Sequence, residues 1–287
     1  MALTMELDQF ISGERFQALA DISFIPLGNG NGESECGFVK EQQRNNNYNV
    51  FYYDENTNTL PEMTGIKKVF VNTWTLNKFF KIIFPLLTES YIFISHNSDL
   101  GISEEHLPFL ESSKVIKWFS QNTYIQHPKL ISLPIGLGNQ QYPHGNLVLI
   151  ESIIEANITK ELLVFKNFDH NTNYTKRVTI DQITTANNIP MWPHLNQEEY
   201  FIRLAQSAFV ISPLGNGIDC HRIWECLYFN TIPIVEEHIC FTQFKDLPIL
   251  FINDWSIVTE DFLRRELKRF NKTNIPQLRL DYWKALL

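Results

Sequence analysis

The sequence predicts an α/β protein made of two Rossmann-like domains that face each other across a cleft. Short apolar runs alternate with amphipathic helical patterns along the chain, which is typical of a mostly parallel sheet covered by helices on both faces. A break at residues 144–146 divides these patterns into two series, and 287 residues are enough for two modest domains. We expect the domains to cover residues 1–147 and 148–258, with residues 259–287 packing back on both.

In the first half, the apolar runs predict strands and the periodic stretches between them predict helices. A glycine-rich loop at residues 28–32 follows the first strand, and Ser103 is suited to cap the second helix. The expected strands are 22–27, 50–53, 69–72, 91–95 and 130–135, and the expected helices are 76–88 and 104–110.

The second half opens with a helix expected at residues 147–158. Asn196 and Glu199 have the spacing of a capping box at the start of a later helix. The expected strands are 162–168, 209–212, 232–235 and 249–252, and the further helices are 174–186, 198–206, 220–229 and 260–270.

The composition excludes several classes of function. The formal net charge is −8 and the basic residues are scattered, so a nucleic-acid or anionic-membrane partner is not expected. The first ten residues contain no apolar core of signal-peptide length. No apolar run approaches the roughly 18 residues that cross a bilayer. We therefore expect no stable membrane insertion and a cytoplasmic location.

The cysteines and histidines do not form a metal-binding or redox pattern. The four cysteines, Cys36, Cys220, Cys226 and Cys240, lack such spacing and are expected to be reduced thiols. The eight histidines are dispersed without a zinc-site spacing. We expect no metal site and no resident cofactor.

The segment from residue 208 to 238 is the most informative part of the chain. It reads as strand, Pro/Gly/Asn loop, helix and strand, which directs the helix N-terminus to the carboxyl edge of a parallel sheet. His221 and Arg222 lie in the first turn of that helix, where the helix dipole disfavours cations unless an anion binds there. Glu225 shares their face. These residues fit the diphosphate and ribose of a nucleotide-sugar. The alternative interpretation is structural: Asp219 is an N-cap, and Arg222 and Glu225 form a surface ion pair.

A second basic pair, Lys176 and Arg177, also begins a helix after the expected strand 162–168. Considered alone, the pair is typical of a solvated surface. Two such pairs in the same half favour a phosphate site there.

Residues 209–225 and 232–235 resemble the donor-binding segment of exostosin-type glycosyltransferases. The shared features are a Pro-x-Gly loop, an arginine three residues before a helical acid, and an Ile-Pro-Ile strand. Residues 244–248 and 253–256 resemble further elements of that family. Blocks at 96–99, 118–122, 133–136 and 167–177 are similar to small soluble relatives of the kind found in bacteria and large algal viruses. Asn230 stands where relatives carry glycine, and asparagine tolerates the left-handed conformation at a helix end.

The resemblance implies a two-domain GT-B arrangement, inversion at the anomeric carbon and metal-independent transfer. The co-substrate would be a UDP-sugar, with xylose slightly preferred, and the partner a glycan acceptor. The donor-binding residues are expected to be Arg177, Ser212, Gly215, Asn216, Gly217, His221, Arg222 and Glu225.

Inversion requires a proton acceptor opposite the leaving diphosphate. The block 91–99 runs from a buried strand into a polar loop at its carboxyl end, where α/β folds place chemistry. We expect Asp99 to be the base, with His96 orienting the acceptor or serving as the base itself. The alternative is that Asp99 caps a turn and His96 is an ordinary loop residue. Asp219 is a rival base, although an N-cap role would make it less available.

Two other functions are weighed against transfer. A non-catalytic nucleotide-sugar or glycan-binding module on the same fold would bind donor without turnover. An NAD-dependent enzyme is suggested only by the isolated Gly136-Leu-Gly138, which lacks the third glycine and the acidic residue of the dinucleotide pattern.

Overall fold

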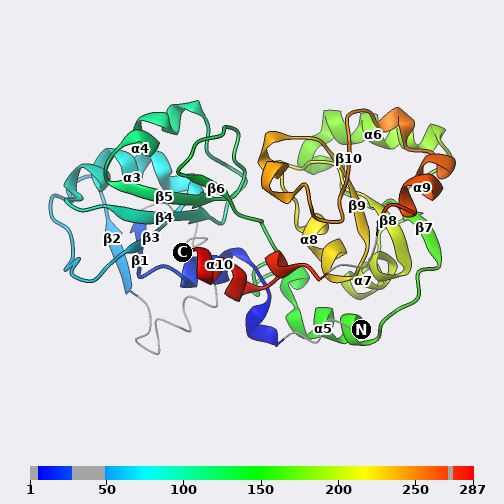
Figure 1. The fold of residues 1–287 in the computed structure, drawn as a ribbon, viewed down its shortest axis with the longest axis horizontal. Coiled ribbons are helices and arrows are strands. Elements are labelled where there is room, and N and C mark those ends of the chain that lie inside the picture. The colour runs from blue at the N-terminus through cyan, green and yellow to red at the C-terminus, as the bar shows by residue number, and fades with distance from the viewer. Residues whose placement is uncertain (1–5, 28–48, 271–273) are drawn as a thin grey trace.

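The computed structural model describes residues 6–27, 49–270 and 274–287, and it contains two separate parallel sheets with helices around them (Figure 1). The fold is therefore of the α/β class that the alternating pattern predicts, and each half is consistent with a Rossmann-like unit. The glycine-rich loop expected at residues 28–32, and Cys36, lie outside the described ranges.

The first sheet has the strand order β2-β1-β3-β4-β5-β6, and every neighbouring pair is parallel. All five residues of β1 are buried, as expected for a central strand covered on both faces. Since all strands run the same way, their carboxyl ends meet at one edge. The strands are β1 (Ile22–Pro26), β2 (Asn49–Tyr53), β3 (Lys68–Asn72), β4 (Tyr91–His96), β5 (Val115–Ser120) and β6 (Leu130–Ser132).

Two helices of this half are broken relative to the prediction. Helix α3 (Leu76–Ile82) is followed by a separate 3-10 turn, η4 (Phe84–Leu86). Pro85 lies in that turn and cannot continue the α-helical hydrogen bonds. The helix expected at 104–110 consists of a 3-10 turn, η5 (Glu104–His106), and α4 (Leu107–Glu111), with Ser103 at the N-cap position.

One strand and one α-helix of the described first half were not predicted. In strand β5, Lys117 interrupts the apolar residues, so the sequence shows neither a continuous apolar run nor a clean alternation. Helix α1 (Gly13–Ala18) is short and begins with glycine, a poor helix former. The strand expected at 130–135 ends at Ser132, two residues before Pro134.

The second sheet has the order β10-β9-β8-β7 and is also parallel. Asn196 Oδ1 accepts a hydrogen bond from Glu199 N at 2.9 Å, and the Glu199 side chain accepts one from Asn196 N, which confirms the capping box. Asn230 has φ of 51°, in the left-handed region. The strands are β7 (Leu162–Phe165), β8 (Ser207–Ile211), β9 (Ile232–Glu236) and β10 (Leu250–Ile252), and the helices are α5 (Leu147–Glu155), α6 (Tyr174–Ala186), α7 (Gln197–Gln206), α8 (His221–Tyr228) and α9 (Glu260–Leu267).

The two halves share one hydrophobic cluster, which includes Phe16 from α1 and Trp224 from α8. The final helix, α10 (Leu280–Leu286), follows the second half in sequence but lies beside the first half (Figure 1). Its Trp283 ring lies 5.9 Å from Phe16 and 6.4 Å from Phe244, measured between centroids. The last segment thus contacts residues of both halves.

Candidate active site

A cavity of about 360 Å³ lies where the carboxyl edge of the first sheet meets the N-terminus of α8. This volume is within the range of small-molecule sites. Five parts of the chain meet there: the start of α1, the loops after β4 and β5, the segment after β6, and the start of α8. The lining residues are Gly13, His96, Asn97, Ser98, Asp99, Gln121, Ile135, Asn139, Gln141, Tyr142, His144 and His221. The structure thus brings Asp99, His96 and His221 from the predicted site to one cavity.

His96, at the end of β4, has both ring nitrogens engaged. Its Nδ1 accepts a hydrogen bond from Asn97 N at 2.8 Å, so its Nε2 carries the proton and donates to Pro134 O at 3.0 Å. Burial lowers the pKa of His96 to about 4, which keeps the ring neutral near pH 7. Because the backbone occupies both nitrogens, this arrangement favours a positioning role for His96 over that of a base.

Asp99 is exposed in the loop after β4 and lines the cavity. Its Oδ2 accepts a hydrogen bond from Asn216 Nδ2 at 3.3 Å. Asn122, which follows β5, donates from Nδ2 to Asp99 O at 3.1 Å and accepts from Asp219 N at 3.0 Å. The predicted base and the predicted donor loop therefore contact each other directly, although they belong to different sheets.

Gly217 lies at the closest approach of these two loops. A Cβ on this residue would stand 2.7 Å from Asn122 Nδ2 and 3.3 Å from Asp99 O. A side chain here would push the loops apart. Gly215 faces the second half instead, where a Cβ would meet Arg177 Nη2 at 3.1 Å.

His221 begins α8 as predicted and contributes its ring to the cavity. Its Nδ1 donates to Gly136 O at 2.8 Å, which leaves Nε2 as the acceptor nitrogen. Burial lowers the pKa of His221 to about 4. A neutral His221 cannot donate from Nε2 to a phosphate, so the contact predicted for it requires protonation when the anion binds.

Arg222 lies in the same first turn and Glu225 in the next one, and Tyr200 of α7 links the two. The Tyr200 hydroxyl accepts from Arg222 Nε at 3.1 Å and donates to Glu225 Oε2 at 3.3 Å. Burial raises the pKa of Glu225 to about 7, while Arg222 and Tyr200 oppose that rise. Arg222 Nη1 and Ser212 Oγ are buried and have no hydrogen-bond partner among the described residues. Buried polar groups in proteins seldom lack a hydrogen-bond partner.

Arg177 is almost fully buried at the start of α6, next to Arg222. Its Nε and Nη2 donate to Leu214 O at 2.9 Å and Pro213 O at 3.3 Å, and its Nη1 donates to Asp169 O at 2.6 Å. Burial, and after it the charge of Arg222, lower the pKa of Arg177. Arg177 thus fixes the loop after β8 and adds positive charge beside Arg222.

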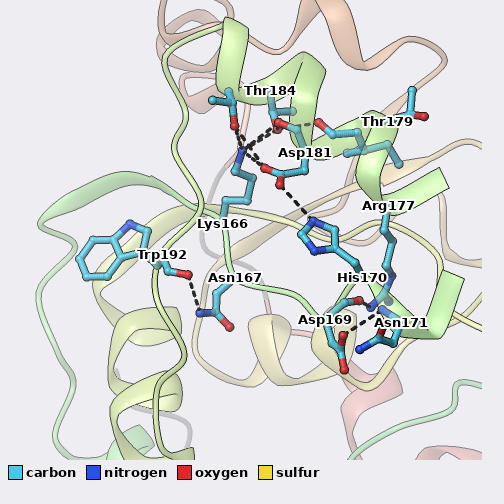
Figure 2. A network of polar contacts seen from close by, with 12 residues as sticks. Lys166, Asn167, Asp169, His170, Asn171, Arg177, Thr179, Asp181, Thr184 and Trp192 are labelled. Carbon is cyan, nitrogen blue, oxygen red and sulfur yellow. Dashed lines mark hydrogen bonds and ion pairs between the residues drawn. The ribbon is translucent and has the colours of Figure 1, made fainter. Parts of the chain in front are cut away.

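The loop that carries Asp169 is itself held by a polar network (Figure 2). Lys166, which is fully buried after β7, donates to Asp181 Oδ1 at 2.8 Å and to Thr184 Oγ1 at 3.0 Å. His170 Nε2 lies 3.0 Å from the other carboxylate oxygen of Asp181. This network fixes the β7–α6 connection and thereby the carbonyl that Arg177 binds.

Asp219 does not cap α8, contrary to the local interpretation of the sequence. The N-cap is Cys220, and the Asp219 carboxylate instead accepts from Ile135 N at 2.7 Å and Trp224 Nε1 at 2.9 Å. Burial raises its pKa to about 7. Asp219 therefore joins the two halves.

Sequence reasoning did not single out Tyr200, Asn122 or Gln121. Gln121 and Asn122 lie in the 118–122 block of the family resemblance, so that signal could have found them. No local signal marks Tyr200, because its partners lie on another helix.

Within residues 6–27, 49–270 and 274–287, no three His, Cys, Asp or Glu side chains are placed to hold a metal ion. The same ranges contain no helix long and apolar enough to cross a bilayer.

Residues 170–281 match the family model of the RXYLT1 C-terminal domain. The match begins just before α6, includes the whole donor segment and ends in α10, and it covers less than half of the chain. It indicates a xylosyltransferase-like glycosyltransferase related to the exostosin type. No curated protein matches the chain.

Proposed function

We propose that this chain is an inverting, metal-independent glycosyltransferase of the GT-B type. It would transfer a sugar, preferentially xylose, from a UDP-sugar to a hydroxyl of a glycan acceptor. The observation that carries the proposal is the pair of buried, unpartnered donors, Arg222 Nη1 and Ser212 Oγ, in the segment that matches the family model. Diphosphate oxygens would supply the missing acceptors.

In this proposal the second half holds the leaving group. Arg222, with Arg177 adding positive charge, stabilises the departing diphosphate at the N-terminus of α8. Glu225 accepts hydrogen bonds from the ribose. Since Arg222 Nη1 and Ser212 Oγ are closed off from solvent, the loop containing Gly215, Asn216 and Gly217 must shift when the donor enters.

The first half supplies the base. Asp99 is exposed at the cavity. It follows a strand of the first sheet, whereas Arg222 follows a strand of the second. Single displacement with inversion needs the base and the leaving group on opposite sides of the anomeric carbon. Asp99 would take the proton from the acceptor hydroxyl as the bond from its oxygen to the sugar forms and the bond to UDP breaks. His96 would hold the end of β4 in place.

The test is a panel of nucleotide-sugars, measured by thermal stabilisation and by product formation with glycan acceptors. A nucleotide-sugar present at 100 times its Kd should raise the free energy of unfolding by about 2.7 kcal/mol. Arg222→Ala should weaken donor binding at least tenfold, through loss of a charge-assisted contact. Glu225→Gln should weaken uridine binding more than pyrophosphate binding. Arg264→Ala, which removes an exposed arginine of α9 paired with Glu260, is the control and should bind normally.

Asp99→Asn should bind donor normally and nearly abolish transfer. If Arg222→Ala binds and turns over UDP-sugars like the wild type, the donor assignment is wrong. Donor binding without transfer to any acceptor would favour the non-catalytic binding module instead.

A further inference from the structure

The cavity beside Asp99 has a composition that points to the chemistry of the acceptor. Four of its lining residues carry side-chain amides, namely Asn97, Gln121, Asn139 and Gln141. Amide groups both donate and accept, as hydroxyl groups do, and they carry no charge. They are suited to a ligand rich in hydroxyls.

Gln121 has a donor that no described residue uses. Its side chain is fully buried, and its Oε1 accepts from Asn97 N at 3.2 Å. Its Nε2 is buried and has no hydrogen-bond partner among the described residues. Because an unmade hydrogen bond of a buried amide is unfavourable, a ligand oxygen at this wall of the cavity would be held by it.

Tyr142 supplies an aromatic surface in the same cavity. Tyr142 is 43% exposed and lines the cavity. The His144 ring packs parallel to it, with 5.4 Å between centroids and 9° between planes, so the imidazole supports the tyrosine ring. The face of a sugar ring that presents C–H groups packs well on such a surface.

The charges of the cavity disfavour an anionic ligand group. None of the described lining residues is a lysine or an arginine. The histidines among them, His96, His144 and His221, have pKa values lowered by burial. Asp99 contributes a carboxylate, which would repel a phosphate or a carboxylate placed beside it.

We infer that this cavity binds the acceptor as an uncharged sugar unit, with Tyr142 packing against the sugar face and Gln121 Nε2 donating to one of its oxygens. The inference rests on the proposed function, because Asp99 must meet the reacting hydroxyl. It adds a substrate class: the acceptor residue at the site of attack is neutral, whatever charge the rest of the glycan carries.

The experiment uses the full chain with UDP present and measures binding of methyl xyloside, methyl galactoside and galactose 6-phosphate by saturation-transfer NMR. At least one neutral glycoside should bind, and the phosphorylated sugar should bind at least tenfold more weakly than galactoside. Tyr142→Ala and Gln121→Glu should each weaken glycoside binding at least tenfold and leave the Kd for UDP-sugar unchanged. Gln121→Glu keeps the oxygen that Asn97 N needs, removes the amide donor and adds a carboxyl charge, which the second control below matches.

Two variants serve as matched controls. Tyr52→Ala removes a tyrosine of similar exposure, 42%, on the edge strand β2. Gln126→Glu makes the same charge change outside the cavity. Both should bind glycosides like the wild type.

The inference is overturned if galactose 6-phosphate binds as tightly as the glycosides, or if no neutral glycoside binds. It is also overturned if Tyr142→Ala weakens UDP-sugar binding and spares the glycosides, since the cavity would then hold the donor. In each case, normal UDP-sugar binding by the wild type would leave the proposed function standing. Loss of UDP-sugar binding by the wild type would count against both.

Discussion

Replacing Asp219 with asparagine should change how the stability of this protein depends on pH. The carboxyl is buried between the two halves, and its pKa is raised from 3.8 to about 7. Folding therefore favours the protonated form. The stability that this proton contributes is fully present below pH 3.8 and is lost as the pH rises through 7.

The size of the effect follows from the shift. Each pKa unit corresponds to about 1.4 kcal/mol, so between pH 5 and pH 8 the wild type should lose about 2.7 kcal/mol of unfolding free energy through Asp219. The amide of Asp219→Asn does not titrate, and its oxygen can still accept from Ile135 N. The variant should lack this loss, while every other titrating group behaves as in the wild type.

The assay is urea unfolding of both proteins at pH 5 and pH 8, compared as a double difference so that the histidines cancel. Asp261→Asn, which changes an exposed carboxyl of α9, is the control and should follow the wild type. If Asp219→Asn loses as much stability between the two pH values as the wild type does, the argument from burial is wrong.

Two further changes test the supports of the site. Asp181→Asn leaves the buried Lys166 ammonium without its carboxylate, and urea unfolding should show a loss of about 3 kcal/mol; adding Lys166→Met should recover part of it. Trp283→Ala removes a ring that is 2% exposed and lies between Phe16 and Phe244, so it should destabilise by about 3–5 kcal/mol. Trp74→Ala, at a ring that is 63% exposed, should change stability by less than about 0.5 kcal/mol, and equal losses for the two tryptophans would contradict the packing argument.

The elements that sequence reasoning located well are those with strong local signals. Helix α6 has the predicted bounds, and α7 starts at the predicted capping box. Strand β5 was missed because Lys117 divides its apolar residues into two short pieces, 115–116 and 118–119. Its neighbours β4 and β6 bury it, and no local pattern encodes those pairings.

In the site, too, the features with local sequence signals were predicted and those set by distant contacts were not. The placement of His221 and Arg222 in the first turn of α8, with Glu225 behind them, follows from helical spacing and was predicted. The hydrogen bond from Ile135 N to Asp219 could not be predicted, because the two residues are 84 positions apart in the chain. The local sequence predicts that Asp219 is an N-cap. In the structure its carboxylate instead accepts from Ile135 N of the other half.

That contact explains how a two-part site can be precise. The predicted base and the predicted donor loop come from different sheets, so their separation depends on how the halves are held together. Two buried polar groups hold them at this point: Asn122 binds Asp99 O and Asp219 N, and Asp219 binds Ile135 N. Because these bonds end on backbone atoms, a change of side chain at Asp99 leaves them intact. The one side-chain contact of Asp99 with the donor loop is the bond that its Oδ2 accepts from Asn216 Nδ2, and the amide oxygen of Asp99→Asn can still accept it. Asp99→Asn therefore isolates catalysis from donor binding.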